Sequence, residues 1–301
     1  MFARAADRPS HLDWLQRQLP KIVVTPSFAA VVLFVYGFIL WTAYVSMTNS
    51  AVLPRYEFVG LVQYERLWSM PRWYVAVDNL WIFGILFIGI SMLVGIVLAI
   101  LLDQRIRAEG ALRTIYLYPM ALSFIVTGTA WKWILNPGLG IERVVQMMGF
   151  ESFQFDWLVD RDMAIYTIVI AGVWQASGFV MALFLAGLRA VDQDIVKAAY
   201  MDGAGMSRIY LRIIIPSMRP VFLSAFVVLA HLAIKSFDLV IALTGGGPGT
   251  ATDLPATFMY AMAFQRSQLG IAAASAMMML TVVAAIIVPY LYSELRAKNR
   301  V

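Results

Sequence analysis

Five side chains in otherwise apolar stretches carry polar, charged or aromatic groups that could hold a solute. They are Trp131, Gln175, Ser177, Lys235 and Asp238. A charge is costly in an apolar environment, so an ionisable residue there is a functional candidate by default. Lys235 and Asp238 are spaced i, i+3, which allows them to pair on one face of a helix. We therefore expect these two residues either to form a structural ion pair or to contact a solute directly.

The remaining residues give little support for catalysis. The chain has no cysteine, which excludes disulfides, zinc–thiolate sites and thiol nucleophiles. His231 has no carboxylate three or four residues away, so we expect a packing histidine rather than a metal ligand. The glycine-rich run 245–249 lacks the Lys and Ser/Thr of a phosphate-binding loop and is expected to end a helix in a turn. We therefore expect no active site, metal or cofactor in this chain.

The composition indicates a membrane protein. Hydrophobic residues make up 61% of the 301 residues and charged residues 14%, whereas soluble domains are roughly half apolar and a quarter charged. A helix needs about 20 apolar residues to cross the hydrocarbon core. Six stretches of about that length are present: 22–46, 79–102, 114–135, 163–188, 221–243 and 270–292. The sequence therefore predicts an all-α integral membrane protein with six transmembrane helices.

The distribution of Lys and Arg predicts the orientation of these helices. If the N-terminus is cytoplasmic, fifteen Lys and Arg residues lie in cytoplasmic segments and six in outer segments. Positive charge is retained on the cytoplasmic side, so both termini are expected there. The first apolar stretch has no clear cleavage site and is expected to be a retained helix rather than a signal peptide.

No internal repeat or flexible linker divides the chain, so a single membrane domain is expected. Residues 1–78 comprise a cytoplasmic tail, the first transmembrane helix and a long outer loop. Residues 79–292 form the transmembrane core, and 293–301 a cytoplasmic C-terminal tail.

The segment between the fourth and fifth stretches, 189–220, is longer than a simple connection requires. It predicts two short amphipathic helices, 192–201 with Asp192 as N-cap, and 206–215 stopped or kinked by Pro216. Between them, Gly203 is expected to adopt positive φ, with Asp202 accepting nearby backbone N–H groups. Two short helices joined in this way would either dock a partner protein or lie on lipid headgroups.

The residues of this segment resemble a family signature. In order, they are Lys197, Ala198, Ala199, Asp202, Gly203, Ala204, Tyr210, Ile213 and Pro216. The pattern resembles the cytoplasmic loop of binding-protein-dependent ABC importer permeases, with Lys197 where the family has Glu and Tyr210 where Phe is usual. The runs 131–140 and 237–248 are similar to the carbohydrate branch of that family, the maltose and glycerol-phosphate type.

The resemblance implies a type I ABC importer permease in a bacterial inner membrane. It implies a heterodimer with a second permease, an ATPase dimer that binds ATP and Mg, and a periplasmic or lipid-anchored sugar-binding protein. The loop 190–216 would couple the pathway to the ATPases, and no nucleic acid partner is expected. Because sugars are often held by an aromatic face with amide or hydroxyl partners, Trp131, Gln175 and Ser177 would suit the pathway.

Two other classes are alternatives to an ATP-driven pump. An ion-coupled secondary transporter would usually place carboxylates and broken helices at the membrane midplane, and only Asp238 lies in such a segment. A structural subunit with no pathway of its own would not need the docking loop.

Overall fold

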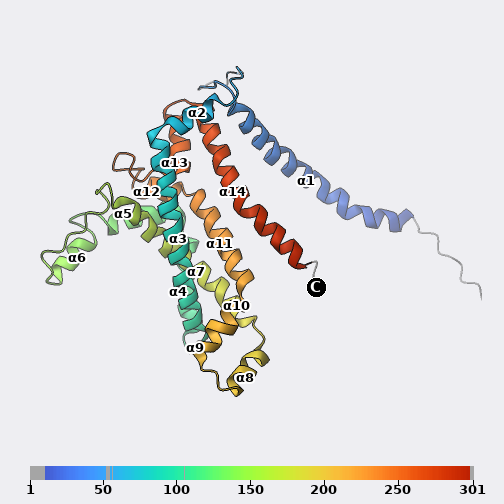
Figure 1. Ribbon diagram of the computed structural model, residues 1–301, viewed down its shortest axis with the longest axis vertical. Coiled ribbons are helices and arrows are strands. Elements are labelled where there is room, and N and C mark those ends of the chain that lie inside the picture. The colour runs from blue at the N-terminus through green and yellow to red at the C-terminus, as the bar shows by residue number, and fades with distance from the viewer. Residues whose placement is uncertain (1–10, 52–54, 56, 105, 299–301) are drawn as a thin grey trace, which may run out of the picture.

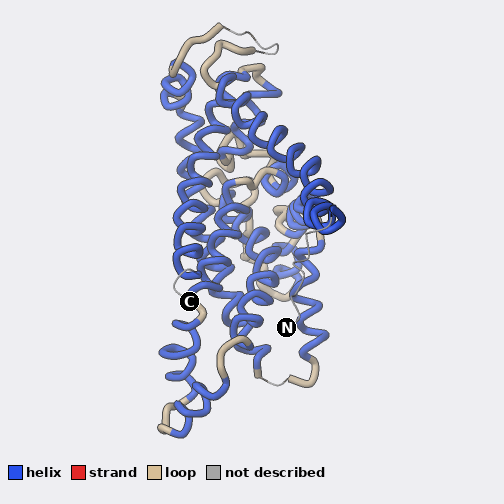
Figure 2. Tube along the Cα trace, turned by 90° about the vertical axis from the view of Figure 1, so that its right-hand side faces the viewer, coloured by secondary structure: helices blue, strands red, loops and turns tan. Residues whose placement is uncertain are grey.

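The computed structural model describes residues 11–51, 55, 57–104 and 106–298 of the chain. Helices connected by loops make up most of this part (Figure 2). Its β-structure, within the described ranges, is an isolated antiparallel bridge between Thr48 and Phe58. The predicted all-α architecture is confirmed.

Four helices of the described chain are long and apolar enough to cross a membrane. They are α1 (His11–Val45), α3 (Pro71–Asp103), α7 (Ala164–Arg189) and α14 (Leu269–Lys298). They coincide with the first, second, fourth and sixth predicted spans. Shorter elements are α2 (Val62–Ser69), α6 (Ile141–Met147), α13 (Pro255–Tyr260) and η2 (Ala261–Gln265).

The third predicted span is not a single straight helix. It comprises α4 (Glu109–Ala121) and α5 (Phe124–Ile134), which meet at an angle of 100°. Leu122 between them is extended, and Ser123 caps α5 by accepting a hydrogen bond from the Val126 N–H. A change to extended backbone followed by a new N-cap ends one helix and begins another. Apolar composition alone does not reveal such a bend.

The fifth predicted span is also interrupted. Helix α11 (Arg219–Ile234) ends before residues 235–237, and α12 (Asp238–Leu243) follows. On its other side, α11 is bent by 66° from the preceding segment, Met206–Ser217. The described chain thus contains four membrane-length helices, or up to six spans if each bent pair counts as one.

The core lies where α3 packs along α7, with α4 and α11 beside them (Figure 1). Gly95 of α3 allows this close approach, because a Cβ there would lie 2.6 Å from Val180 Cγ1 of α7. Small residues let membrane helices approach closely. Phe83, Phe87 and Phe184 fill the same interface and are almost fully buried.

Helix α1 stands apart from this core. Its C-terminal end is tied down where Gln63 Nε2 donates to the Thr48 carbonyl (2.9 Å) and the Gly270 N–H donates to the Ser50 carbonyl (3.1 Å). From there α1 meets α14 and then diverges from the other helices (Figure 1). None of its most apolar stretch is buried against the described chain.

Candidate functional site

The predicted loop forms a helical projection beyond the ends of α3, α4 and α7 (Figure 1). Its first helix is α8 (Gln193–Met201). Asp192 caps this helix, because its Oδ1 accepts the Asp194 N–H at 2.9 Å. The predicted helix and its N-cap are both confirmed.

Gly203 makes the turn after α8 with φ +77°, as predicted. The Ala204 N–H donates to the Ala199 carbonyl (3.1 Å) and the Gly203 N–H to the Tyr200 carbonyl (3.0 Å). These two bonds are those of a Schellman motif, which requires a left-handed residue after the helix. The role expected for the Asp202 carboxylate is wrong: backbone bonds hold the turn, and the Asp202 side chain is exposed.

The second helical run follows as α9 (Met206–Ile209), a wider π-helical turn η1 (Tyr210–Ile214) and α10 (Ile215–Ser217). Pro216 has no N–H and its ring crowds the carbonyl four residues earlier, which the wider turn before it accommodates. The run ends one residue after Pro216, and the chain then bends into α11. The predicted helix and kink are confirmed.

The projection has an inner and an outer face. Ile209 is fully buried and Ala199, Ala204, Tyr210, Ile213 and Pro216 are half-buried. Lys197, Ala198, Asp202 and Gly203 are exposed, together with Ile195, Met201 and Met206. Lys197 Nζ lies 2.9 Å from Asp194 Oδ1, in a pair that is open to solvent. The signature residues thus divide between anchoring the projection and facing outward.

Tyr210 joins the projection to the membrane helices through a group that we call the Tyr210 cluster. Its members are Asp103, Gln104, Glu109, Arg189 and Tyr210. The Tyr210 hydroxyl donates to Asp103 Oδ2 (3.2 Å) and accepts from Gln104 Nε2 (3.2 Å). Arg189 Nη2 lies 2.7 Å from Glu109 Oε1, and Arg189 Nε 3.8 Å from Asp103 Oδ1.

The phenol of Tyr210 stays protonated in this cluster. Burial, followed by the negative charge of Asp103, raises its pKa above the ordinary value of 10.0. Both effects disfavour the phenolate, so the hydroxyl remains a hydrogen-bond donor to Asp103. Sequence reasoning missed the other four residues of the cluster, because their only signal was their place near the ends of predicted spans.

Three of the five predicted pathway residues lie near the break between α4 and α5. Gln175 of α7 is buried, and its Nε2 donates to the Leu122 carbonyl at the break (2.8 Å), whereas its Oε1 has no partner. Trp131 of α5 packs edge-on against Trp174, with ring centroids 5.9 Å apart. Ser177 is half-buried, with its hydroxyl 3.5 Å from the Trp174 carbonyl. Gln175 therefore helps to shape the break.

The expected ion pair between Lys235 and Asp238 is not formed. In the part of the chain that the structure describes, neither residue has a salt-bridge partner, and both are exposed. The i, i+3 rule applies within a continuous helix, but α11 ends at Ile234 and α12 begins at Asp238. The two charges instead flank an interruption.

The two interrupted spans are packed on each other, since α5 lies against α12. At their crossing, a Cβ on Gly128 would lie 2.7 Å from Ala242 Cβ and 3.0 Å from the Leu239 carbonyl oxygen. Irregular backbone at membrane depth occurs only where it is buried in protein or lines a water-filled cavity. The two interruptions therefore lie in spans that pack closely on each other.

Comparison with known proteins identifies the family. Residues 91–297 match the model of the binding-protein-dependent transport system inner membrane component. This chain belongs to that family. The predicted resemblance to binding-protein-dependent importer permeases is confirmed.

Three relatives of this permease have similar lengths, and the names of two of them refer to sugars. A probable ABC transporter permease of Pyrococcus horikoshii is 38% identical over 286 residues, covering 94% of this chain and 98% of the relative. A xylose/arabinose import permease of Haloferax volcanii is 37% identical, covering 89% and 85%. A trehalose/maltose transport permease of Thermococcus litoralis is 30% identical, covering 87% of each chain.

A solved structure shows the same fold. It is a bacterial alginate ABC transporter in complex with a periplasmic protein that carries an alginate pentasaccharide. The matched chain has a TM-score of 0.80 and 18% identity, covering 95% of this permease and 98% of that chain. The permease therefore has the type I importer fold.

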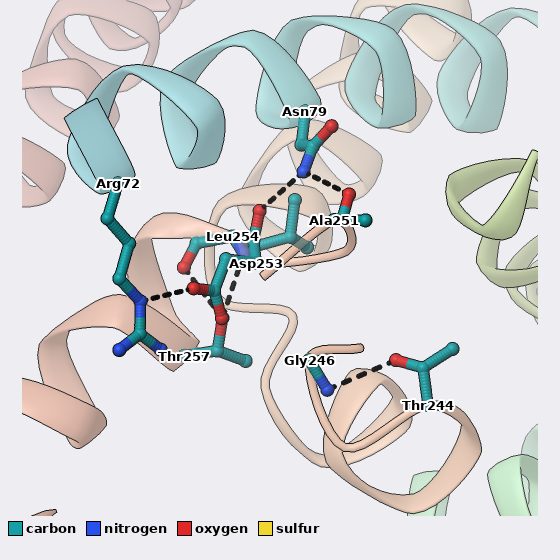
Figure 3. A network of polar contacts seen from close by, with 8 residues as sticks. All are labelled: Arg72, Asn79, Thr244, Gly246, Ala251, Asp253, Leu254 and Thr257. Carbon is teal, nitrogen blue, oxygen red and sulfur yellow. Dashed lines mark hydrogen bonds and ion pairs between the residues drawn. The ribbon is translucent and has the colours of Figure 1, made fainter. Parts of the chain in front are cut away.

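A second polar network connects the first turns of α3 with the segment that leads into α13 (Figure 3). Asp253, only 2% exposed, forms an ion pair with Arg72 at the start of α3 and accepts a hydrogen bond from the Thr257 hydroxyl (3.2 Å). Asn79 Nδ2 donates to the carbonyls of Ala251 (2.8 Å) and Asp253 (3.0 Å). These contacts fix the loop between α12 and α13 onto α3.

The glycine-rich run forms part of this loop. Gly245, Gly246 and Gly249 have φ values of +67°, +89° and +65°, which confirms the predicted turn after a helix. The Gly246 N–H donates to Thr244 Oγ1 (Figure 3). Sequence reasoning missed the network itself, because Arg72 and Asp253 are 181 positions apart and carry no shared motif.

Proposed function

We propose that this permease is the transmembrane subunit of an ATP-driven sugar importer and forms the translocation pathway with a second, homologous permease. The observation that carries the proposal is the projection 192–217, which is anchored by buried residues and presents exposed apolar side chains such as Met201 and Met206. An apolar patch on a rigid segment is typical of a protein docking site. The projection would dock on one subunit of an ATPase dimer, where ATP and Mg would be bound and hydrolysed.

The translocation pathway would run past the two interrupted spans. Helix α11 has 16 residues, about 24 Å at 1.5 Å per residue, less than the roughly 30 Å of a hydrocarbon core. Lys235 and Asp238 would then lie within the membrane, where charges face a partner or a water-filled path. We place them, with Trp131, Gln175 and Ser177, beside the sugar.

The solute would be delivered by a sugar-binding protein on the outer face of the cell membrane. Both termini and the projection would be cytoplasmic, as the distribution of Lys and Arg indicates. ATP and the loaded binding protein would each favour one of two access states of the pathway. The carbohydrate names of the relatives and the periplasmic protein bound to the alginate transporter support this assignment.

The test is transport by the complex reconstituted in vesicles with the partner subunits and radiolabelled sugars. We expect uptake to need ATP and the binding protein and to persist when an uncoupler removes ion gradients. Uptake that stops when the uncoupler is added and does not depend on ATP would instead identify an ion-coupled transporter. If the chain fails to retain an ATPase subunit in a pull-down and its removal leaves uptake intact, it is a structural subunit.

A further inference from the structure

The Tyr210 cluster connects four elements by polar contacts. Asp103 ends α3, Glu109 begins α4 and Arg189 ends α7. Tyr210 belongs to η1, within the projection. The carboxylate of Asp103 uses one oxygen for the Tyr210 hydroxyl and the other for Arg189. Asp103 is therefore the point at which the projection, α3 and α7 are held by a single side chain.

The polar contacts of Tyr210 and Asp103 fix an orientation that the apolar packing around Tyr210 does not. Ile209 beside it is fully buried and Ile214 nearly so, and both belong to the cluster of apolar residues that includes Leu102 and Leu188. Apolar packing keeps the projection in place but lets surfaces slide, because it has no directional preference. Hydrogen bonds and ion pairs fix the orientation as well as the distance.

We propose that the Tyr210–Asp103–Arg189 contact is the joint that makes α3 and α7 move with the projection, so that its loss uncouples ATP hydrolysis from transport. This inference rests on the proposed function and adds positioning residues to it. Glu109 extends the joint to α4, because it forms the shorter of the two contacts to Arg189. Since α4 leads into the break at Leu122, a movement of the projection would reach the pathway through these side chains.

The test measures ATP hydrolysed per sugar transported by the reconstituted complex. Tyr210→Phe removes only the hydroxyl, and Asp103→Asn removes only the charge. We expect each to raise this ratio roughly two- to tenfold, since a typical net hydrogen bond biases an equilibrium by about that factor. The double variant should be no worse than the more affected single one, because both break one joint. Asp103→Glu, which keeps the charge, should recover part of the coupling.

Two controls separate this role from simple stabilisation. Tyr74→Phe removes a phenol oxygen from the far, exposed end of α3 and should leave the ratio unchanged. The amount of assembled complex is measured for every variant. A normal ratio per assembled complex in both Tyr210→Phe and Asp103→Asn would overturn the proposal, whether or not assembly falls. If Asp103→Asn does not assemble, Tyr210→Phe alone decides. Wild-type uptake that is independent of ATP would instead contradict the proposed function.

Discussion

Gly203 shows at the residue scale how a local backbone requirement can be read from sequence. The amphipathic pattern of α8 stops at an Asp-Gly pair, which favours a turn with positive φ, and the structure has φ +77° there. The part assigned to Asp202 could not be settled in this way. A side-chain cap and a Schellman motif follow from the same two residue types, and only the hydrogen bonds distinguish them.

Replacing Gly203 with Val should deform the projection without affecting the membrane helices. No atom lies within 4 Å of a Cβ at this position, so the effect is conformational. A non-glycine residue in the left-handed region costs about 1–2 kcal/mol, and a β-branched side chain is worse. We expect normal insertion but roughly tenfold weaker stimulation of ATPase activity by the loaded binding protein. The measurement is ATP hydrolysis by the reconstituted complex with and without that protein.

Gly205→Val is the matched control for this prediction. Gly205 has φ −66° and equally open surroundings, so the same side chain fits without strain. Full stimulated activity and full transport in Gly203→Val would show that the projection does not couple ATP hydrolysis to the pathway.

The Arg72–Asp253 pair is a second feature at the residue scale. Removing one of its two charges is expected to destabilise the protein more than replacing both. Asp253 is almost fully buried. Removing one partner of a buried pair leaves the other charge unpaired and lowers the free energy of unfolding by about 3–5 kcal/mol. We therefore expect Arg72→Met to lower the thermal midpoint of the purified permease clearly. The double variant Arg72→Met/Asp253→Asn should recover part of that loss. A double variant less stable than Arg72→Met alone would contradict this account.

At the scale of elements, apolar run length predicted the long helices well and the interruptions poorly. Helices α1, α3, α7 and α14 each contain an uncharged stretch of sufficient length. The bend at Leu122 lies within an uncharged stretch, so the hydropathy of that stretch does not predict the bend. The bend is stabilised by Gln175, which lies 53 positions away and donates a hydrogen bond to the Leu122 carbonyl. A tertiary contact of this kind cannot be found from the spacing of neighbouring residues.

The crossing of α5 and α12 gives a prediction for the paired breaks. Gly128→Val would bring its side chain against Ala242 and the backbone of α12, and overpacking of this kind costs about 1–3 kcal/mol. We expect less assembled complex and a lower thermal midpoint, measured by fluorescence-detected gel filtration after heating. Gly89→Val in α3 has open space around it in this chain and should have a much smaller effect. Equal stability of the two variants would show that the crossing is not tightly packed in the membrane.

At the scale of the whole molecule, the orientation of the chain in the membrane is a prediction from charge rather than from packing. Fifteen Lys and Arg residues against six and six predicted spans lead us to expect Met1 and Val301 on the same, cytoplasmic side. Reporter fusions after Val301 and within 138–162 should therefore report opposite sides of the membrane. An outer C-terminus would contradict both the orientation and the count of six spans.

Helix α1 has a consequence for how this molecule is made. Translation begins at the N-terminus, so α1 is synthesised before the other membrane-length helices described here, whereas α14, which it contacts, is synthesised after them. The ribosome must complete nearly the whole chain before this contact can close. The most apolar stretch of α1 is not buried against the described chain even once this contact has formed, so only lipid or another protein can cover it. A nascent permease stalled before Leu269 would therefore carry a first helix that still lacks its contact with α14.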